Sequence, residues 1–187
     1  MRPRDSGWQR WALIRVGIPL LLLSAGCSRT PKAPLLRDEP VYQNGEAGFR
    51  FQVPEGWTQV AKGDIPGEAP QPHLLVEYKG LNMDQPAGLQ VTAVDLPTST
   101  SLEKYLTGPS FGSEIWRPTA KAERFQVKGV EATRFAFESK ARQQNLAREV
   151  VAFRRNERVY LFTGIFALGD TKSREQIRGA VKSTIWK

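Results

Sequence analysis

Cys27 is the residue best suited to chemistry, because it is the only cysteine among 187 residues. A cysteine sulfur can act as a nucleophile, a redox group or a metal ligand, and it can also carry a lipid. Cys27 ends an apolar run, and residues 20–28 read LLLLSAGCS. The residues in front of this cysteine decide which of these chemistries applies.

The segment before Cys27 has the pattern of a secretory signal. Four arginines and one acid, Asp5, precede the apolar run of residues 16–28. That run contains Pro19 and is shorter than the roughly 20 apolar residues that a membrane-spanning helix needs. A basic region followed by a short apolar region and small residues predicts a cleaved signal peptide, here residues 1–26.

Residues 23–27, LSAGC, resemble the bacterial lipobox, in which signal peptidase II cuts before the cysteine and a diacylglyceryl group is attached to its sulfur. The resemblance implies cleavage between Gly26 and Cys27 and acylation of Cys27, for example with palmitate. Ser24 departs from the box, which usually has a larger aliphatic residue there. The alternative is an ordinary signal peptide cut near Ala25, which would leave one unused thiol in an exported chain.

Lipidation predicts a membrane-attached protein rather than a membrane-spanning one, since two or three acyl chains on one residue anchor durably. In the lipoproteins that this segment resembles, an aspartate after the cysteine favours the inner membrane. Ser28 stands there. We therefore expect an exported lipoprotein on the periplasmic side of the outer membrane rather than the inner membrane.

Two further motifs could suggest catalysis. Residues 108–112, GPSFG, match the G-x-S-x-G nucleophile elbow, which needs a strand before Ser110, a helix after it and a later histidine base. The sole histidine, His73, comes earlier. His73 could be a base or a metal ligand, but its neighbouring acids show no ligand spacing. We expect no enzyme activity, no metal and no cofactor, with a hydrolase as the least favoured class.

Arginines form the remaining candidate site. Three lie around a predicted hairpin tip and two near its entry, namely Arg154, Arg155 and Arg158, and Arg142 and Arg148. They could be a solvated tip that discourages edge-to-edge strand pairing. They could instead form a patch for anionic head groups, lipopolysaccharide or an acidic protein. Nucleic acid fits the same charge, but export argues against it.

The elements that would position these residues begin after a linker. The precursor has a net charge of +8, and removal of residues 1–26 leaves about +5. Residues 27–40 contain three prolines, which favours an extended tether reaching on the order of 40 Å. Residues 41–187 are long enough for one core without disulfides. We expect one domain there.

Alternating apolar residues predict strands over most of this domain. Phe49, Phe51 and Val53 alternate with polar residues before a turn at Pro54–Gly56. Later segments predict strands that meet at Lys128–Gly129 and at Asn156–Glu157. Strands that are apolar on both sides, such as residues 150–153, indicate a sheet with both faces covered.

We expect helices to cover the two faces of this sheet. Residues 101–106 predict a short helix, and residues 169–187 predict a last helix with Ile177, Ala180, Val181 and Ile185 on one face. Ser173 and Gln176 have capping-box spacing. Strands, a helical interruption, more strands and a last helix predict an α+β domain, an antiparallel sheet flanked by helices on both faces.

Residues 48–57, GFRFQVPEGW, the late segment VVAFRRNERVYLFTGIF and the closing VKSTI together resemble the PsbP-like superfamily. This superfamily includes an extrinsic photosystem II subunit and bacterial lipoproteins of the DcrB and LpqN kind. The resemblance covers residues 41–187 and implies an α/β/α sandwich and a non-catalytic role in binding or assembly. It carries over no active site.

The sequence thus predicts a lipid-anchored cell-envelope protein that binds an envelope protein or assembles with one. Its oligomeric state is left open. The alternative is a carrier of a small ligand or lipid, with a pocket lined by aromatic residues such as Trp57, Trp116 and Phe166. A carrier needs a concave pocket of at least about 300 Å³.

Overall fold

The computed structural model describes residues 40–62, 72–80, 86–108, 116–141 and 144–187. The predicted signal peptide of residues 1–26 and almost all of the predicted tether of residues 27–40 lie outside this part. The described elements, in chain order, are β1 Val41–Asn44, β2 Phe49–Gln52, β3 Trp57–Lys62, β4 His73–Gly80, β5 Gly88–Asp95, α1 Leu102–Leu106, β6 Arg117–Pro118, β7 Glu123–Val127, β8 Val130–Ala141, β9 Gln144–Arg155, β10 Arg158–Ala167, α2 Thr171–Lys182 and β11 Ile185–Trp186.

The strands form two antiparallel sheets. The large sheet has the order β3-β4-β5-β10-β9-β8-β6, and β7 also pairs with β8. The small sheet has the order β1-β2-β11, so the last strand pairs with one of the first. Long pairings between β8, β9 and β10 form the centre of the large sheet.

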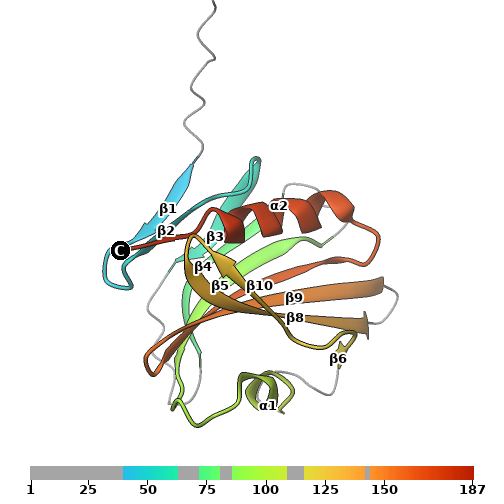
Figure 1. Cartoon of the computed structure of the whole chain (residues 1–187). Coiled ribbons are helices and arrows are strands. Elements are labelled where there is room, and N and C mark those ends of the chain that lie inside the picture. The colour runs from blue at the N-terminus through green and yellow to red at the C-terminus, as the bar shows by residue number, and fades with distance from the viewer. Residues whose placement is uncertain (1–39, 63–71, 81–85, 109–115, 142–143) are drawn as a thin grey trace, which may run out of the picture. The chain divides into compact units, whose positions relative to one another are not determined.

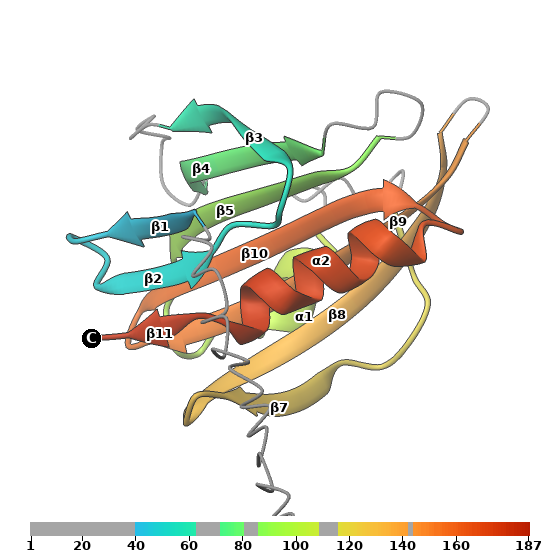
Figure 2. The same cartoon turned by 90° about the horizontal axis from the view of Figure 1, so that it is seen from above.

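Each face of the large sheet has its own hydrophobic cluster. Figure 1 shows α2 and the small sheet on one side of the large sheet and α1 on the other. Figure 2 shows β11 beyond the end of α2, beside β2. Strand alternation sends Val151 and Phe153 toward the α2 side and Val150 and Ala152 toward the α1 side.

The prediction of an α+β domain with helices on both faces is wrong, because the molecule is mostly β. The small sheet does much of the covering that was expected of helices. Its inner face is aromatic, and Trp186 lies 4.9 Å from Phe49 and 5.0 Å from Tyr160 between ring centroids. Phe49 and Phe51 therefore belong to a second sheet packed on the large one. On the other face, α1 has only five residues.

The predicted turns are confirmed. The backbone φ angles of Lys128 and Gly129 are 48° and 84°, as a two-residue hairpin turn with matching strand twist requires. Asn156 has a φ of 57° between β9 and β10. The turn at residues 54–57 closes with a hydrogen bond of 3.1 Å from the Trp57 amide to the Pro54 carbonyl.

Helix α2 is present as predicted, but its cap differs. The N-cap is Asp170, whose Oδ1 accepts a hydrogen bond of 3.0 Å from the Ser173 amide. Hydrogen bonding from the Ser173 side chain, and then from its amide, holds the pKa of Asp170 below its usual value. Gln176 instead accepts a bond of 3.0 Å from the indole N–H of Trp57. The expected capping box of Ser173 and Gln176 is therefore wrong.

Candidate functional site

An open groove lies on the α1 side of the large sheet and has a volume of about 690 Å³. Its floor consists of side chains from β8 and β9, and its walls come from the segment around α1 and from β7. We call this the α1-side groove. The floor residues are Thr133, Phe135, Ala152 and Arg154.

Strand register builds the floor. Thr133 on β8 lies opposite Ala152 on β9, and alternation places Phe135 and Arg154 on the same face. Phe135 and Ala152 are buried members of the cluster on this side.

Arg154 fixes one wall. Its guanidinium donates hydrogen bonds to the backbone carbonyls of Leu96, Pro97 and Thr100, at 3.1, 3.1 and 2.9 Å. These carbonyls belong to the segment between β5 and α1. Ser101 then caps α1 by accepting a bond of 3.4 Å from the Lys104 amide. One charged side chain from β9 therefore ties this wall to the large sheet.

The groove is lined by hydroxyl groups and by charges of both signs. The hydroxyls come from Thr98, Thr100, Ser101 and Thr133, and Arg124 faces the groove from β7. Glu103 and Glu131 supply carboxylates. Neither histidine nor cysteine lines the groove as described, and the described residues contain no cluster of three or more potential metal ligands. This arrangement is suited to binding a polar segment through hydrogen bonds.

The structure separates the arginines that the sequence grouped together. Arg148 and Arg154 lie on the α1 side of β9, whereas Arg155 points to the opposite face. Arg158 on β10 also lies on the α2 side. Arg142, like Gly26 and Cys27, lies outside the described residues.

Arg148 and Arg155 both have contacts within the fold. Arg148 is buried, and its guanidinium lies 4.6 Å from the ring of Trp116 and 4.7 Å from that of Phe137. This burial lowers the pKa of Arg148 to about 10. Arg155 lies 5.1 Å from the Trp186 ring. Whether these arginines bind an anionic partner remains a prediction.

His73 lines a second pocket, of about 250 Å³. Its lining includes Arg158 and Tyr160. Arg158 donates to Asp95 at 2.7 and 3.2 Å, which lowers the pKa of the Asp95 carboxyl and raises that of Arg158. Arg158 is thus committed to an ion pair at the edge of this pocket. Ser110, the candidate nucleophile of the GPSFG motif, lies outside the described residues.

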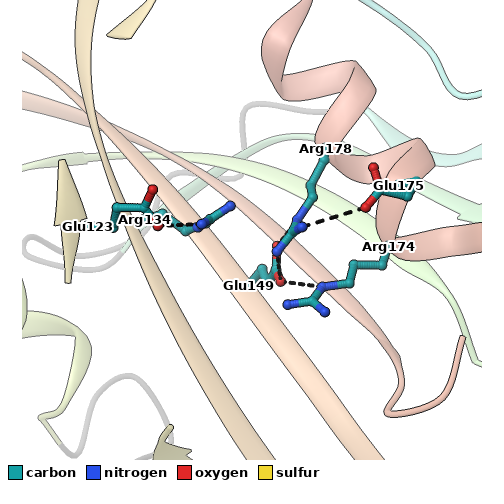
Figure 3. Close-up of polar contacts among 6 residues, drawn as sticks. All are labelled: Glu123, Arg134, Glu149, Arg174, Glu175 and Arg178. Carbon is teal, nitrogen blue, oxygen red and sulfur yellow. Dashed lines mark hydrogen bonds and ion pairs between the residues drawn. The ribbon is translucent and has the colours of Figure 1, made fainter. Parts of the chain in front are cut away.

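A charged cluster that the sequence analysis missed fastens α2 to the large sheet (Figure 3). The carboxylate of Glu149, on β9, accepts hydrogen bonds from Arg174 at 2.7 Å and from Arg178 at 2.8 Å. Burial alone would raise the pKa of Glu149, but the bonds from the two arginines outweigh it and lower the pKa. The only hint in the sequence is an acid inside an apolar strand together with arginines four residues apart.

The aromatic residues that were expected to line a carrier pocket do not share one. Phe166 is buried in the cluster under α2, and Trp57 packs against that same cluster. Trp116 packs in the cluster on the opposite face. No helix among the described residues has the length and apolar character to cross a membrane.

No protein-family model and no curated protein matches the sequence. A crystal structure from Bacteroides thetaiotaomicron VPI-5482 is similar, with a TM-score of 0.52 and 8% identity over 79% of this chain. The chain spans about half of that protein, 48% of its length. At an identity of 8%, the likeness shows the fold alone.

Two further solved structures are similar. LpqN, described as involved in cell envelope biogenesis of Mycobacterium tuberculosis, has a TM-score of 0.49 and 14% identity, covering 78% of this chain and 88% of LpqN. LpqN is one of the proteins that the sequence was expected to resemble. A protein of unknown function from Pseudomonas aeruginosa has a TM-score of 0.46 and 11% identity, covering 79% and 96%.

Proposed function

We propose that this chain is a lipid-anchored cell-envelope protein that binds a protein partner, without catalysis, through the α1-side groove. The proposed location rests on the signal sequence and on Cys27 at its end. Ser28 after the cysteine favours the periplasmic side of the outer membrane. The tether of residues 27–40 would let the domain stand away from the bilayer.

The groove is the observation that carries the binding proposal. Its volume of about 690 Å³ would suffice for a small ligand, but the groove is open, and hydroxyl and charged groups line it alongside apolar side chains. Carriers of apolar ligands enclose most of the ligand surface in an apolar pocket. An extended polar segment of another protein suits this lining better, because its backbone can bond to threonine and serine hydroxyls along the wall.

Membrane fractionation tests the anchor. The wild-type protein should sediment with membranes and carry diacylglyceryl and acyl mass on Cys27, whereas the Cys27→Ala chain should lose both. The outer-membrane fraction should contain most of the wild-type protein. Equal membrane association of the two chains would contradict the proposed anchor.

Site-specific photocrosslinking tests the groove. A photoreactive residue at Glu103, which is exposed on the groove wall, should give a discrete protein adduct in intact cells. The same residue at Lys172, exposed on α2 on the other side of the sheet, is the matched control. Replacing Arg124 by Glu should reduce the Glu103 adduct. Adducts of equal yield at both positions would show that the groove is not the binding site.

A further inference from the structure

The outer face of the small sheet combines exposed aliphatic side chains with cations. Val41 on β1 is 55% exposed and Ile185 on β11 is 39% exposed. Both line a shallow pocket of about 270 Å³ together with Arg50 and Lys128. We call these four residues the basic–aliphatic patch. As described, the pocket lining contains no carboxylate.

Strand pairing explains why these side chains lie together. Arg50 on β2 lies opposite Ile185, and Val41 lies opposite Gln52. Their neighbours along each strand point inward and form the aromatic layer, as the burial of Phe49 and Phe51 shows. Because the inner face is fixed by aromatic packing, the outer face cannot turn away from solvent.

The chain enters the domain at this patch. The Pro40 carbonyl accepts a hydrogen bond of 2.7 Å from the Val53 amide, which fixes the residue before Val41 against the end of β2. The expected tether ends at Pro40. If Cys27 is lipidated, the patch is therefore the part of the domain that the tether holds nearest to the bilayer.

We infer that the basic–aliphatic patch docks the domain on the anionic phospholipid surface to which the protein is anchored. The inference rests on the proposed lipid anchor. Arg50 and Lys128 are attracted to anionic head groups, and Val41 and Ile185 are placed to reach the interface beside them. Docking of a tethered domain is intramolecular, so contacts too weak to hold a free protein can orient it. The α1-side groove, on the opposite side of the large sheet, then faces away from this membrane.

Fluorescent labels can report which face meets the membrane. The full lipidated protein is placed in phosphatidylcholine vesicles with or without phosphatidylglycerol, and quencher-bearing lipids are included. Acylation blocks the sulfur of Cys27, so an introduced cysteine is the only reactive thiol. A label at Gln52→Cys lies beside the patch, in the lining of the same pocket. A label at Glu103→Cys lies on the opposite side and serves as the control.

Phosphatidylglycerol should strengthen quenching of the Gln52 label and leave the Glu103 label little changed. Each cation near an anionic surface changes the docked-to-undocked ratio about fivefold, so Arg50→Gln with Lys128→Gln should lower it about 25-fold. The matched double variant, Lys104→Gln with Arg124→Gln, removes two cations near the groove and should have little effect. Unchanged thermal unfolding would show that the variants fold.

Equal quenching of both labels, or quenching that ignores phosphatidylglycerol, would overturn the inference. Quenching that depends on protein density rather than on lipid charge would indicate that the patch binds a second copy of the chain. That result would also overturn the inference. The Cys27→Ala chain, titrated with the same vesicles, separates the patch from the anchor. Loss of stable attachment in this variant would support the anchor, because contacts of the patch can be too weak to hold a free protein. A lack of charge-dependent quenching of the Gln52 label in the lipidated chain would count against the patch alone.

Discussion

Replacing Glu149 by Gln should destabilise the domain more than any surface charge substitution. The exchange keeps the shape of the side chain but removes the negative charge that faces Arg174 and Arg178. Three hydrogen bonds of 2.7 to 2.8 Å to a carboxylate are weakened at once. The amide can still accept through one oxygen, but its NH₂ group faces a guanidinium.

The exposure of each partner sets the magnitude. Removing one partner of a buried ion pair costs about 3–5 kcal/mol. The Glu149 side chain is 6% exposed, whereas those of Arg178 and Arg174 are 24% and 44% exposed. Because the arginines can regain water, we expect the lower end, about 3 kcal/mol. Each kcal/mol lowers Tm by about 2–4 °C in a domain of this size, which gives a decrease of roughly 6–12 °C.

Thermal and urea unfolding of the wild type and the Glu149→Gln variant measure this difference. Glu175→Gln is the matched control, since Glu175 lies 3.6 Å from Arg178 but is 67% exposed. It should cost less than about 0.5 kcal/mol. If both variants lose the same small amount, the buried cluster does not fasten α2 to the sheet.

The stability difference should depend on pH. The pKa of Glu149 is lowered in the folded state, so its contribution is present above the ordinary carboxyl pKa of about 4.3 and is lost as the pH falls through the lower folded pKa. The gap between wild type and Glu149→Gln should therefore be constant near neutral pH and should narrow below about pH 4. A gap that widens in acid would refute the assigned direction.

Two further predictions concern α2 and the groove wall. A Cβ at Gly164 would lie 2.7 Å from Cγ2 of the buried Ile177, so Gly164→Ala should cost about 1–3 kcal/mol in thermal unfolding. Gly179 has open space around it, so Gly179→Ala should instead stabilise α2 by roughly 0.5–1 kcal/mol. An unchanged stability of the Gly164→Ala variant would contradict the close packing. Arg154→Gln removes charged hydrogen bonds worth about 2 kcal/mol, so amide exchange at Thr100, whose N–H bonds to the Pro97 carbonyl, should accelerate about 30-fold. Unchanged exchange there would mean that other contacts hold the wall.

Local patterns in the sequence predicted the local structure well. The hairpins at Lys128–Gly129 and Asn156–Glu157 follow from turn residues between alternating strands, and both are present. The last helix follows from its apolar face, although Asp170 rather than Ser173 caps it. These features depend on residues close together in the chain, where spacing constrains geometry strongly.

The assignment of strands to sheets could not be predicted in the same way. A two-residue strand, β11, has no periodicity of its own, and its pairing with β2 depends on contacts of Trp186 with distant rings. The prediction of a helix-flanked sandwich was wrong for this reason. The groove wall likewise depends on bonds from Arg154 to carbonyls far away in the sequence, and backbone carbonyls leave no signal in residue types.

The pairing of β2 with β11 makes the fold depend on the order in which the chain emerges. Synthesis proceeds from the N-terminus, so β2 is made long before its partner β11. Until Ile185 and Trp186 arrive, one edge of β2 lacks its ladder and the rings of Phe49 and Tyr160 lack the indole that contacts them. The aromatic layer is therefore completed only once the C-terminal strand has been synthesised, and until then β2 exposes an unpaired strand edge.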